Sequence, residues 1–188
     1  NDCEKISEVL NQYECDEIFL AESVQQKADL WRARRSAGEA VKSHSIYKEE
    51  DTVVPRAELP KLLKGVKEIG KKYGFRSVCY GHAGDGNLHP LILYDNSIPG
   101  AFKQVEELGG EILKLCVMAG GSISGEHGIG SDKACYMPDM FTDADLETMQ
   151  YVRQAFNPRN LANPGKIFPT PRTCGESVNQ QNIKQLKD

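Results

Sequence analysis

Three of the four histidines in this chain lie in two glycine-rich segments, and these segments carry the residues best suited to chemistry. His82 and His89 lie near the two ends of the first segment, whereas Glu126 and His127 lie in the second, Gly120–Gly130. Neutral imidazole and carboxylate are good ligands for borderline divalent ions, and glycine lets the backbone approach a ligand closely. Histidine is also the side chain that most readily carries a proton near neutral pH. The pattern therefore predicts a metal-assisted proton-transfer site.

We expect His82, His89 and Glu126 to be the metal ligands. If strands flank the turn between the two histidines, both imidazoles can face one point across the mouth of a hairpin. Three ligands leave coordination positions open, as a catalytic ion requires, and this set of nitrogen and oxygen atoms admits zinc, manganese or iron. His127 directly follows a ligand, so we expect it to be the catalytic base that takes a proton from a hydroxyl group acidified by the ion.

The elements that must position these residues are predicted from hydrophobic periodicity and capping signals. Helices are expected over 4–13, 23–41, 56–73, 100–118 and 143–155, and strands over 18–20, 76–80 and 91–94. Residues 42–57 are polar and irregular, apart from an extended stretch before Pro55. Asp85 and Asn87 are expected to hold the glycine-rich turn by local hydrogen bonds. This order of elements predicts an α+β fold, a ferredoxin-like sandwich in which helices cover an antiparallel sheet.

Composition excludes several classes of protein. The chain has 188 residues, of which 39% are hydrophobic and 27% charged, which is ordinary for a soluble domain with its own core. The net charge of -4 argues against a nucleic-acid partner, because phosphate binding needs a basic excess. No apolar run approaches the roughly 20 residues that span a bilayer. The six cysteines are scattered without a CxxC pair, which favours reduced thiols and a cytoplasmic protein.

Three segments of the chain resemble the C-terminal part of the FAD-linked oxidases related to vanillyl-alcohol oxidase. Within them the chain looks most like the flavin subunit of bacterial glycolate oxidase, also called glycolate dehydrogenase. The segments are GHAGDGNLHPLIL at 81–93, GGSISGEHGIG at 120–130 and FNPRNLANPGKIFP at 156–169. Weaker matches are LWRARRSA at 30–37, Tyr47-Lys48 and Val53-Val54-Pro55. The three strong segments in this order are highly specific, although no single one would be.

The resemblance implies a flavoenzyme that oxidises a 2-hydroxy acid, glycolate or D-lactate, to the 2-oxo acid. The hydroxyl proton passes to a base while the C2 hydride passes to FAD. By this resemblance, His82, His89 and Glu126 match the divalent-metal ligands of the family, and His127 matches its base.

The resemblance also assigns residues outside the two glycine-rich segments. Arg34 matches the arginine that grips the substrate carboxylate, a role that suits a bidentate guanidinium. Lys48 matches a second cationic contact with the substrate. Asn163, Gly165 and Lys166 belong to the closing segment that returns to the flavin domain, and we expect them to bind the cofactor.

The resemblance further implies that residues 1–170 are the substrate- and metal-binding domain of a longer enzyme, followed by a polar tail at 171–188. The FAD-binding domain is absent, and the glycine-rich segments lack the strand–GxGxxG–helix context of a dinucleotide site. We therefore expect this piece alone to bind no FAD tightly and to be inactive. Kinship implies two further partners, a second flavin-type subunit and an iron-sulfur subunit, and a cytoplasmic location or one peripheral to the inner membrane.

Other functions remain open at this point. A D-lactate or D-2-hydroxyglutarate dehydrogenase of the same family would have the same motifs. The run Pro90–Leu93 offers no polar side chain for a distal carboxylate, which favours a short monocarboxylate. A metal-dependent hydrolase could use the same His-His-Glu site, and a regulatory domain could bind a small acid without chemistry. Arg34 and the closing Asn-Pro-Gly-Lys segment favour the flavin enzyme, because a hydrolase needs no segment that packs against a flavin domain.

Overall fold

The computed structural model describes residues 1–14, 16–43 and 45–169, and the chain divides into two compact units. The first unit, Asn1–Ser43, contains helices α1 (Asp2–Leu10) and α2 (Val24–Lys42). Helix α2 begins at a capping box, in which the Ser23 hydroxyl accepts a hydrogen bond from the backbone N–H of Gln26 and the Gln26 side chain accepts one from the backbone of Ser23. Both helices predicted for this region are confirmed.

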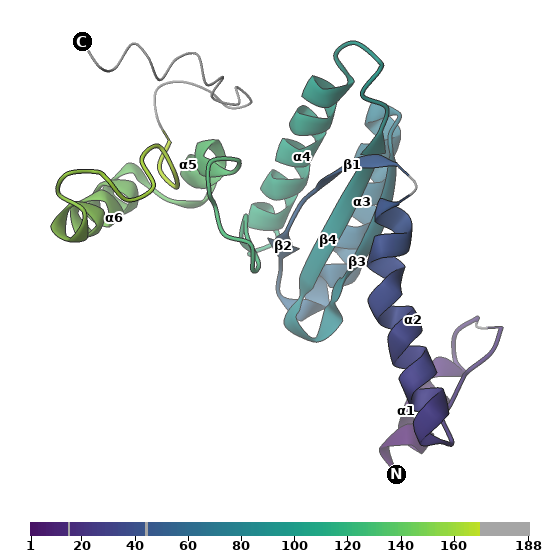
Figure 1. Ribbon diagram of the computed structural model, residues 1–188. Coiled ribbons are helices and arrows are strands. Elements are labelled where there is room, and N and C mark those ends of the chain that lie inside the picture. The colour runs from purple at the N-terminus through teal and green to yellow at the C-terminus, as the bar shows by residue number, and fades with distance from the viewer. Residues whose placement is uncertain (15, 44, 170–188) are drawn as a thin grey trace. The chain divides into compact units, whose positions relative to one another are not determined.

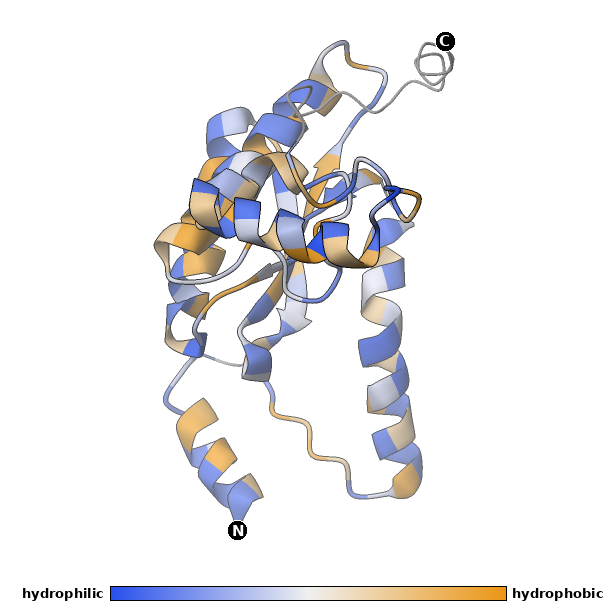
Figure 2. Cartoon of the chain, turned by 90° about the vertical axis from the view of Figure 1, so that its left-hand side faces the viewer, coloured by the Kyte–Doolittle hydropathy of each residue, from blue (hydrophilic) through white to orange (hydrophobic). Residues whose placement is uncertain are grey.

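The strand predicted over residues 18–20 is wrong. These residues form an exposed hydrophobic coil that leads into α2 (Figure 2), with Phe19 71% and Leu20 67% exposed. A strand needs a neighbour to pair with its backbone N–H and C=O groups, and none of the described strands pairs with this stretch. Three apolar residues in a row are too few to specify a strand without such a partner.

The second unit, which begins at His44, is built on one antiparallel sheet (Figure 1). Its strands are β1 (Ile46–Glu49), β2 (Thr52–Val53), β3 (Arg76–His82) and β4 (Asn87–Tyr94). Strand β4 is central, since β3 pairs along one of its edges while β1 and β2 pair with successive parts of the other. Strands β1 and β2 thus act as one interrupted strand.

Helices α3 (Leu59–Tyr73) and α4 (Ala101–Met118) cover one face of the sheet. A short 3-10 turn, η1 (Arg56–Glu58), precedes α3, and Gly74 ends it with a left-handed φ of 76°. The resulting order, β-α-β-β-α, contains the first five elements of a ferredoxin-like unit, so the predicted α+β sandwich is confirmed. The shared core consists of Val54, Leu62, Val66, Leu88, Ile92, Val105, Leu108, Ile112 and Cys116.

A smaller helical part follows α4. It contains the 3-10 turn η3 (Ala134–Tyr136) and the helices α5 (Met137–Met140) and α6 (Asp143–Phe156), of which only α6 was predicted. Thr142 caps α6, because its hydroxyl accepts a hydrogen bond from the backbone N–H of Asp145. The apolar cluster of Leu113, Ile123, Met137 and Leu146 joins this part to the outer side of α4.

The hairpin that carries the two histidines has longer strands than the sequence predicts. Its strands run to His82 and start again at Asn87, and the 3-10 turn η2 (Ala83–Asp85) with Gly86 in a left-handed conformation joins them. Strand β1 lies in the region expected to be irregular. A search for apolar runs misses this strand, because its adjacent charged residues Lys48 and Glu49 lie on opposite faces and interrupt any apolar pattern.

Candidate metal centre

His82 and His89 lie on the same face of the sheet, opposite to the face that α3 and α4 cover. His82 pairs with Asn87 and His89 pairs with Tyr80, so the two histidines are diagonal neighbours across the hairpin. Their ring centroids are 6.0 Å apart and the rings stand edge to face. His82 is exposed, whereas His89 is only 2% exposed. The hairpin therefore brings the two imidazoles together, as the sequence predicts.

Glu126 and His127 reach the same point from the loop that follows α4. The loop joins the sheet edge at Ser122, whose backbone N–H donates to the carbonyl oxygen of Val53 at 2.9 Å. Oε1 of Glu126 then lies 3.1 Å from Nε2 of His89, and the ring of His127 stacks on that of His89 at 5.2 Å. Nε2 of His127 is 3.8 Å from Oε1 of Glu126. The two glycine-rich segments thus converge although they are far apart in the sequence.

The residues present fit a divalent ion. One ligand atom each from His82, His89 and Glu126 lies within 4.8 Å of the other two. Two imidazole nitrogens and a carboxylate oxygen suit zinc, manganese or iron. Nε2 of His89 faces Glu126, so it is the nitrogen that would bind the ion, while Nδ1 is buried without a hydrogen-bond partner.

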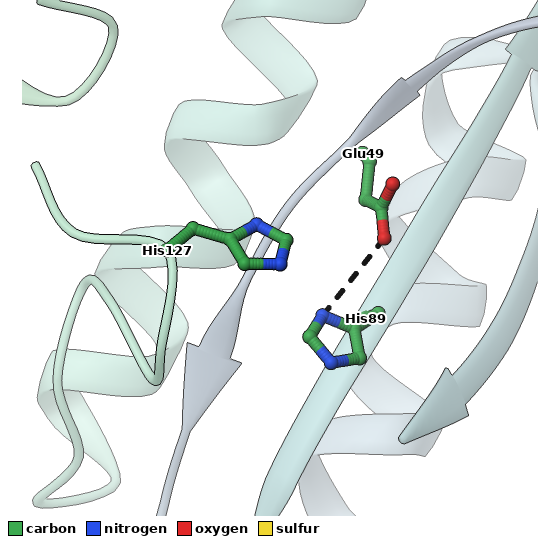
Figure 3. A group of neighbouring side chains, drawn as sticks. All are labelled: Glu49, His89 and His127. Carbon is green, nitrogen blue, oxygen red and sulfur yellow. Dashed lines mark ion pairs between the residues drawn. The ribbon is translucent and has the colours of Figure 1, made fainter. Parts of the chain in front are cut away.

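A second group of potential ligands shares His89 with the first. It consists of Glu49, His89 and His127, and Figure 3 shows the Glu49 carboxylate of β1 directed at the His89 ring. Oε1 of Glu49 lies 4.0 Å from Nδ1 of His89 and accepts a hydrogen bond from the Tyr80 hydroxyl at 2.5 Å. A carboxylate in this position can orient a ligating histidine through the ring nitrogen that does not bind metal.

Asp51 holds the loop that carries Glu126 and His127. Burial alone would raise the pKa of Asp51, but hydrogen bonds from the backbone of His127 and Glu126 and from the side chains of Ser124 and Asn87 hold it well below its usual range. The expectation that Asn87 holds its own turn by local hydrogen bonds is wrong, because its side-chain hydrogen bonds go to Asp51 and Thr52 instead. Its amide donates to Oδ1 of Asp51 at 3.0 Å and to the carbonyl oxygen of Thr52 at 3.1 Å.

Lys48 lies on the helix-covered side of the sheet, because it precedes Glu49 in β1 and consecutive strand residues face opposite ways. Its ammonium is paired with Asp132 at 3.2 Å and with Glu50 at 3.5 Å, next to Gly109 of α4. Burial alone would lower the pKa of Lys48, but the two carboxylates outweigh that effect and raise it. The structure therefore places Lys48 in an ion-pair network, on the other face from the histidines.

Arg34 lies on α2 in the first unit, exposed, with its guanidinium 5.7 Å from the centre of the Trp31 ring. The metal-ligand candidates belong to the second unit. The contact of Arg34 with a substrate carboxylate therefore stays a prediction.

The closing segment that contains Asn163, Gly165 and Lys166 forms a turn after α6. Arg153 of α6 organises it, since the guanidinium donates to the carbonyl oxygens of Ala162, Asn163 and Lys166 at 2.6–2.9 Å. Asn163 and Gly165 have left-handed φ angles of 48° and 74°. The turn also lines a cavity of about 520 Å³ together with the end of α6. Its role in cofactor binding stays a prediction, and the predicted tail at 171–188 lies outside the described residues.

Sequence reasoning missed Glu49, Asp51 and Tyr80, which surround His89. A signal for the first two was present, because Glu49 and Asp51 are two residues apart just before the stretch expected to be extended, and they would share a face if the extended backbone began earlier. Tyr80 is likewise two residues before His82 in a predicted strand.

The thiols match the sequence analysis only in part. Cys3, Cys79 and Cys116 are free, as expected for reduced thiols. Cys135 is disulfide-bonded, so the expectation of reduced thiols throughout is wrong at this residue. Among the described residues, no helix is both long and apolar enough to cross a membrane.

Comparison with known proteins gives a consistent answer. The family described as "FAD linked oxidases, C-terminal domain" matches residues 1–167. The glycolate oxidase subunit GlcD of Escherichia coli (strain K12) is 43% identical over 93% of this chain and 35% of that protein. A D-lactate dehydrogenase of Anaerostipes hadrus is 33% identical over 87% of the chain and 35% of that protein. A D-2-hydroxyglutarate dehydrogenase of Stutzerimonas stutzeri (strain A1501) is 34% identical over 79% of the chain and 33% of that protein. The chain spans about a third of the length of these relatives.

Proposed function

Since this chain belongs to the family of the FAD linked oxidases, as their C-terminal domain, we propose that it is the substrate- and metal-binding domain of a flavin-dependent 2-hydroxy-acid dehydrogenase. The observation that carries the proposal is the convergence of His82, His89 and Glu126, with the His127 ring stacked beside them. In an oxidase of 2-hydroxy acids, such a group can hold the hydroxyl end of the substrate.

His82, His89 and Glu126 would hold the divalent ion. The ion supplies Lewis acidity, which lowers the pKa of a hydroxyl group bound beside it. Glu126 and His127 each keep 51% of the side chain exposed, so a small acid can reach them from solvent. His89 fixes the inner end of the site, since it is held within the sheet.

The remaining residues bind the substrate and move its proton. Nε2 of His127 takes the hydroxyl proton, and this nitrogen already lies 3.8 Å from the carboxylate of Glu126. Arg34 binds the substrate carboxylate through a bidentate pair that fixes C2 for hydride transfer. The predicted contact of Lys48 with the substrate stays a prediction and is not part of this proposal, because Lys48 is paired with Asp132 and Glu50 on the other face of the sheet.

FAD supplies the hydride acceptor, and we propose that it is held mainly by a domain outside this chain. The turn with Asn163, Gly165 and Lys166 would contribute to the cofactor site. A second flavin-type subunit and an iron-sulfur subunit would receive the electrons, in the cytoplasm or at the inner membrane.

Glycolate is the substrate we favour, because the relative at 43% identity is named a glycolate oxidase subunit. D-Lactate and D-2-hydroxyglutarate are the alternatives, since other relatives bear those names. The apolar run Pro90–Leu93 no longer bears on this choice. Leu91 and Ile92 are fully buried, so core packing accounts for their apolar character.

The test is steady-state turnover by the longer enzyme that contains this domain, with glycolate, D-lactate and D-2-hydroxyglutarate, before and after removal of metal by a chelator. We expect the highest kcat/KM for glycolate, loss of turnover after chelation and recovery when a divalent ion is added back. Turnover that survives complete metal removal would contradict the proposed role of the site. Ester and phosphate hydrolysis should be undetectable, and finding it would favour a metal-dependent hydrolase instead.

A further inference from the structure

A single buried carboxylate connects three segments around the metal centre. Asp51 lies just after β1, its side chain is 1% exposed, and its partners are the hairpin and the loop after α4. Its backbone carbonyl oxygen also accepts a hydrogen bond from Lys133 at 2.7 Å. Lys133 is itself buried and donates to the carbonyl oxygen of Ile123 at 2.8 Å. Asp51 therefore sits at a point where the sheet edge and the loop are already joined.

One oxygen of this carboxylate accepts four hydrogen bonds from the loop that follows α4. Oδ2 of Asp51 accepts hydrogen bonds from the Ser124 hydroxyl at 2.9 Å and from the backbone N–H groups of Gly125, Glu126 and His127 at 2.9, 2.9 and 2.8 Å. Bonds from backbone N–H groups to an ionised acceptor are about twice as strong as neutral ones. The backbone of the metal-ligand candidate Glu126 and of the base candidate His127 is thus fixed by one atom.

The other oxygen faces the hairpin. Oδ1 of Asp51 accepts the Asn87 amide at 3.0 Å and lies 3.8 Å from Nδ1 of His89, the buried nitrogen without a hydrogen-bond partner. An ion bound through Nε2 of His89 leaves Nδ1 as a donor, and a carboxylate at this distance needs only a small shift to accept it. Gly125 fits between these groups because a Cβ atom there would lie 2.7 Å from Oδ1 of Asp51.

We infer that Asp51 is a positioning residue, which holds Glu126 and His127 in register with the two histidines of the β3–β4 hairpin. The inference rests on the proposed metal centre, but it concerns how the centre is assembled rather than which reaction it serves. A carboxylate that served only the fold would stabilise the chain without affecting the affinity of a folded chain for metal. A positioning carboxylate affects both.

The test compares Asp51→Asn with the wild-type chain, using Co²⁺ as the probe. We expect the folded variant to bind Co²⁺ about 10- to 100-fold more weakly, with an altered visible absorption spectrum. Without metal, the amide protons of residues 125–127 should exchange at least about tenfold faster, because the uncharged amide that replaces the carboxylate is a weaker hydrogen-bond acceptor. Asp95→Asn is the matched control, since Asp95 also accepts from a backbone N–H, that of Ser97, but in an exposed turn. It should leave Co²⁺ affinity unchanged.

Unchanged Co²⁺ affinity in a folded Asp51→Asn chain overturns the inference, even if the amides exchange faster. If this variant does not fold, Ser124→Ala provides the second test, because it removes only one of the four hydrogen bonds to Oδ2, from a half-buried residue. We expect a smaller loss of affinity, of a few-fold, and unchanged affinity overturns the inference. If the wild-type chain binds no Co²⁺, the proposed metal centre is wrong. In that case the exchange rates of amides 125–127 still show whether Asp51 holds the loop, since they should be slower in wild type than in the variant.

Discussion

His89 differs from the other residues of the site in its burial. It is 2% exposed, while Glu126 and His127 keep half of each side chain in solvent. The buried ring contacts Tyr80, His82 and His127 and is faced by three carboxylates. The geometry of the site therefore depends on this residue and on the close approach of the loop to it.

Substitution of Gly125 tests whether the loop after α4 approaches His89 as closely as described. A Cβ atom at this position would overlap the Asn87 amide and lie 2.7 Å from Oδ1 of Asp51, and both side chains are buried. Gly125→Ala should lower the free energy of unfolding by about 1–3 kcal/mol and weaken metal binding. Urea unfolding and metal titration measure these effects. Gly84→Ala in the neighbouring turn is the control, since a Cβ atom there meets nothing within 4 Å. Equal behaviour of the two variants would contradict the packing described.

Substitution of His127 tests whether this residue transfers the proton without binding the metal. His127→Ala in the longer enzyme should reduce kcat about 10²- to 10⁴-fold, the usual contribution of a general base, while metal affinity stays within a few-fold of wild type. Glu126→Gln should impair both. Turnover of His127→Ala at the wild-type rate with saturating substrate would exclude His127 as the base.

At the scale of elements, helices were easier to predict than strands. Ser23 and Thr142 cap α2 and α6 within one residue of the helix starts predicted at 23 and 143, because a cap is a local hydrogen bond that needs no distant partner. Strand pairing depends on remote segments, so Ile18–Leu20 was predicted as a strand without a partner and β1 was missed. Of the site, the chemistry of the histidines and Glu126 could be predicted. The spacing of Glu49 and Asp51 could at most indicate a shared face, while the hydrogen bonds of Asp51 could not be predicted, because they reach about 75 residues along the chain.

Two cysteines, Cys116 in α4 and Cys79 in β3, are packed between the helices and the sheet, and we expect their thiols to react slowly. Burial raises the pKa of Cys116 in α4 to about 12 and that of Cys79 in β3 to about 11, so almost no thiolate is present at pH 8. Alkylation at pH 8 followed by mass spectrometry should label exposed Cys3 at least about tenfold faster than either. Labelling of Cys116 as fast as Cys3 in the folded chain would contradict the packing of α4 on the sheet.

These raised pKa values also set the direction of a pH effect on stability. An unfolded thiol ionises near pH 8.5, whereas the buried thiols stay protonated to higher pH. Their contribution is therefore fully present below about pH 8.5 and is lost as pH rises toward 11 and 12. Urea unfolding at pH 7 and 10 should show the loss, and Cys116→Ala should make it smaller.

At the scale of the whole molecule, the proposed roles are divided between parts. Arg34 belongs to the first unit, the histidines belong to the second, and the chain spans about a third of its relatives. Metal binding should therefore be a property of the second unit alone, while turnover should need the rest of the enzyme. We expect the 188-residue chain by itself to hold no flavin and to reduce no dye.

Arg34→Ala in the longer enzyme tests this division. Loss of a charged hydrogen-bonded contact should lower kcat/KM for glycolate about 10- to 100-fold and leave metal affinity unchanged. Arg35→Ala, the next residue on α2 and also exposed, is the matched control and should be neutral. A neutral Arg34→Ala would remove Arg34 from the substrate site.

Equilibrium dialysis of the chain against Zn²⁺ or Mn²⁺, with the bound metal counted by elemental analysis, tests the central claim most directly. We predict one ion per chain for wild type and for His127→Ala, and a large loss of affinity for His82→Ala, His89→Ala and Glu126→Gln. Retention of the ion by His82→Ala together with its loss in His127→Ala and Glu49→Gln would place it in the alternative group around His89. That result, or a wild-type chain that binds no ion, would contradict the account.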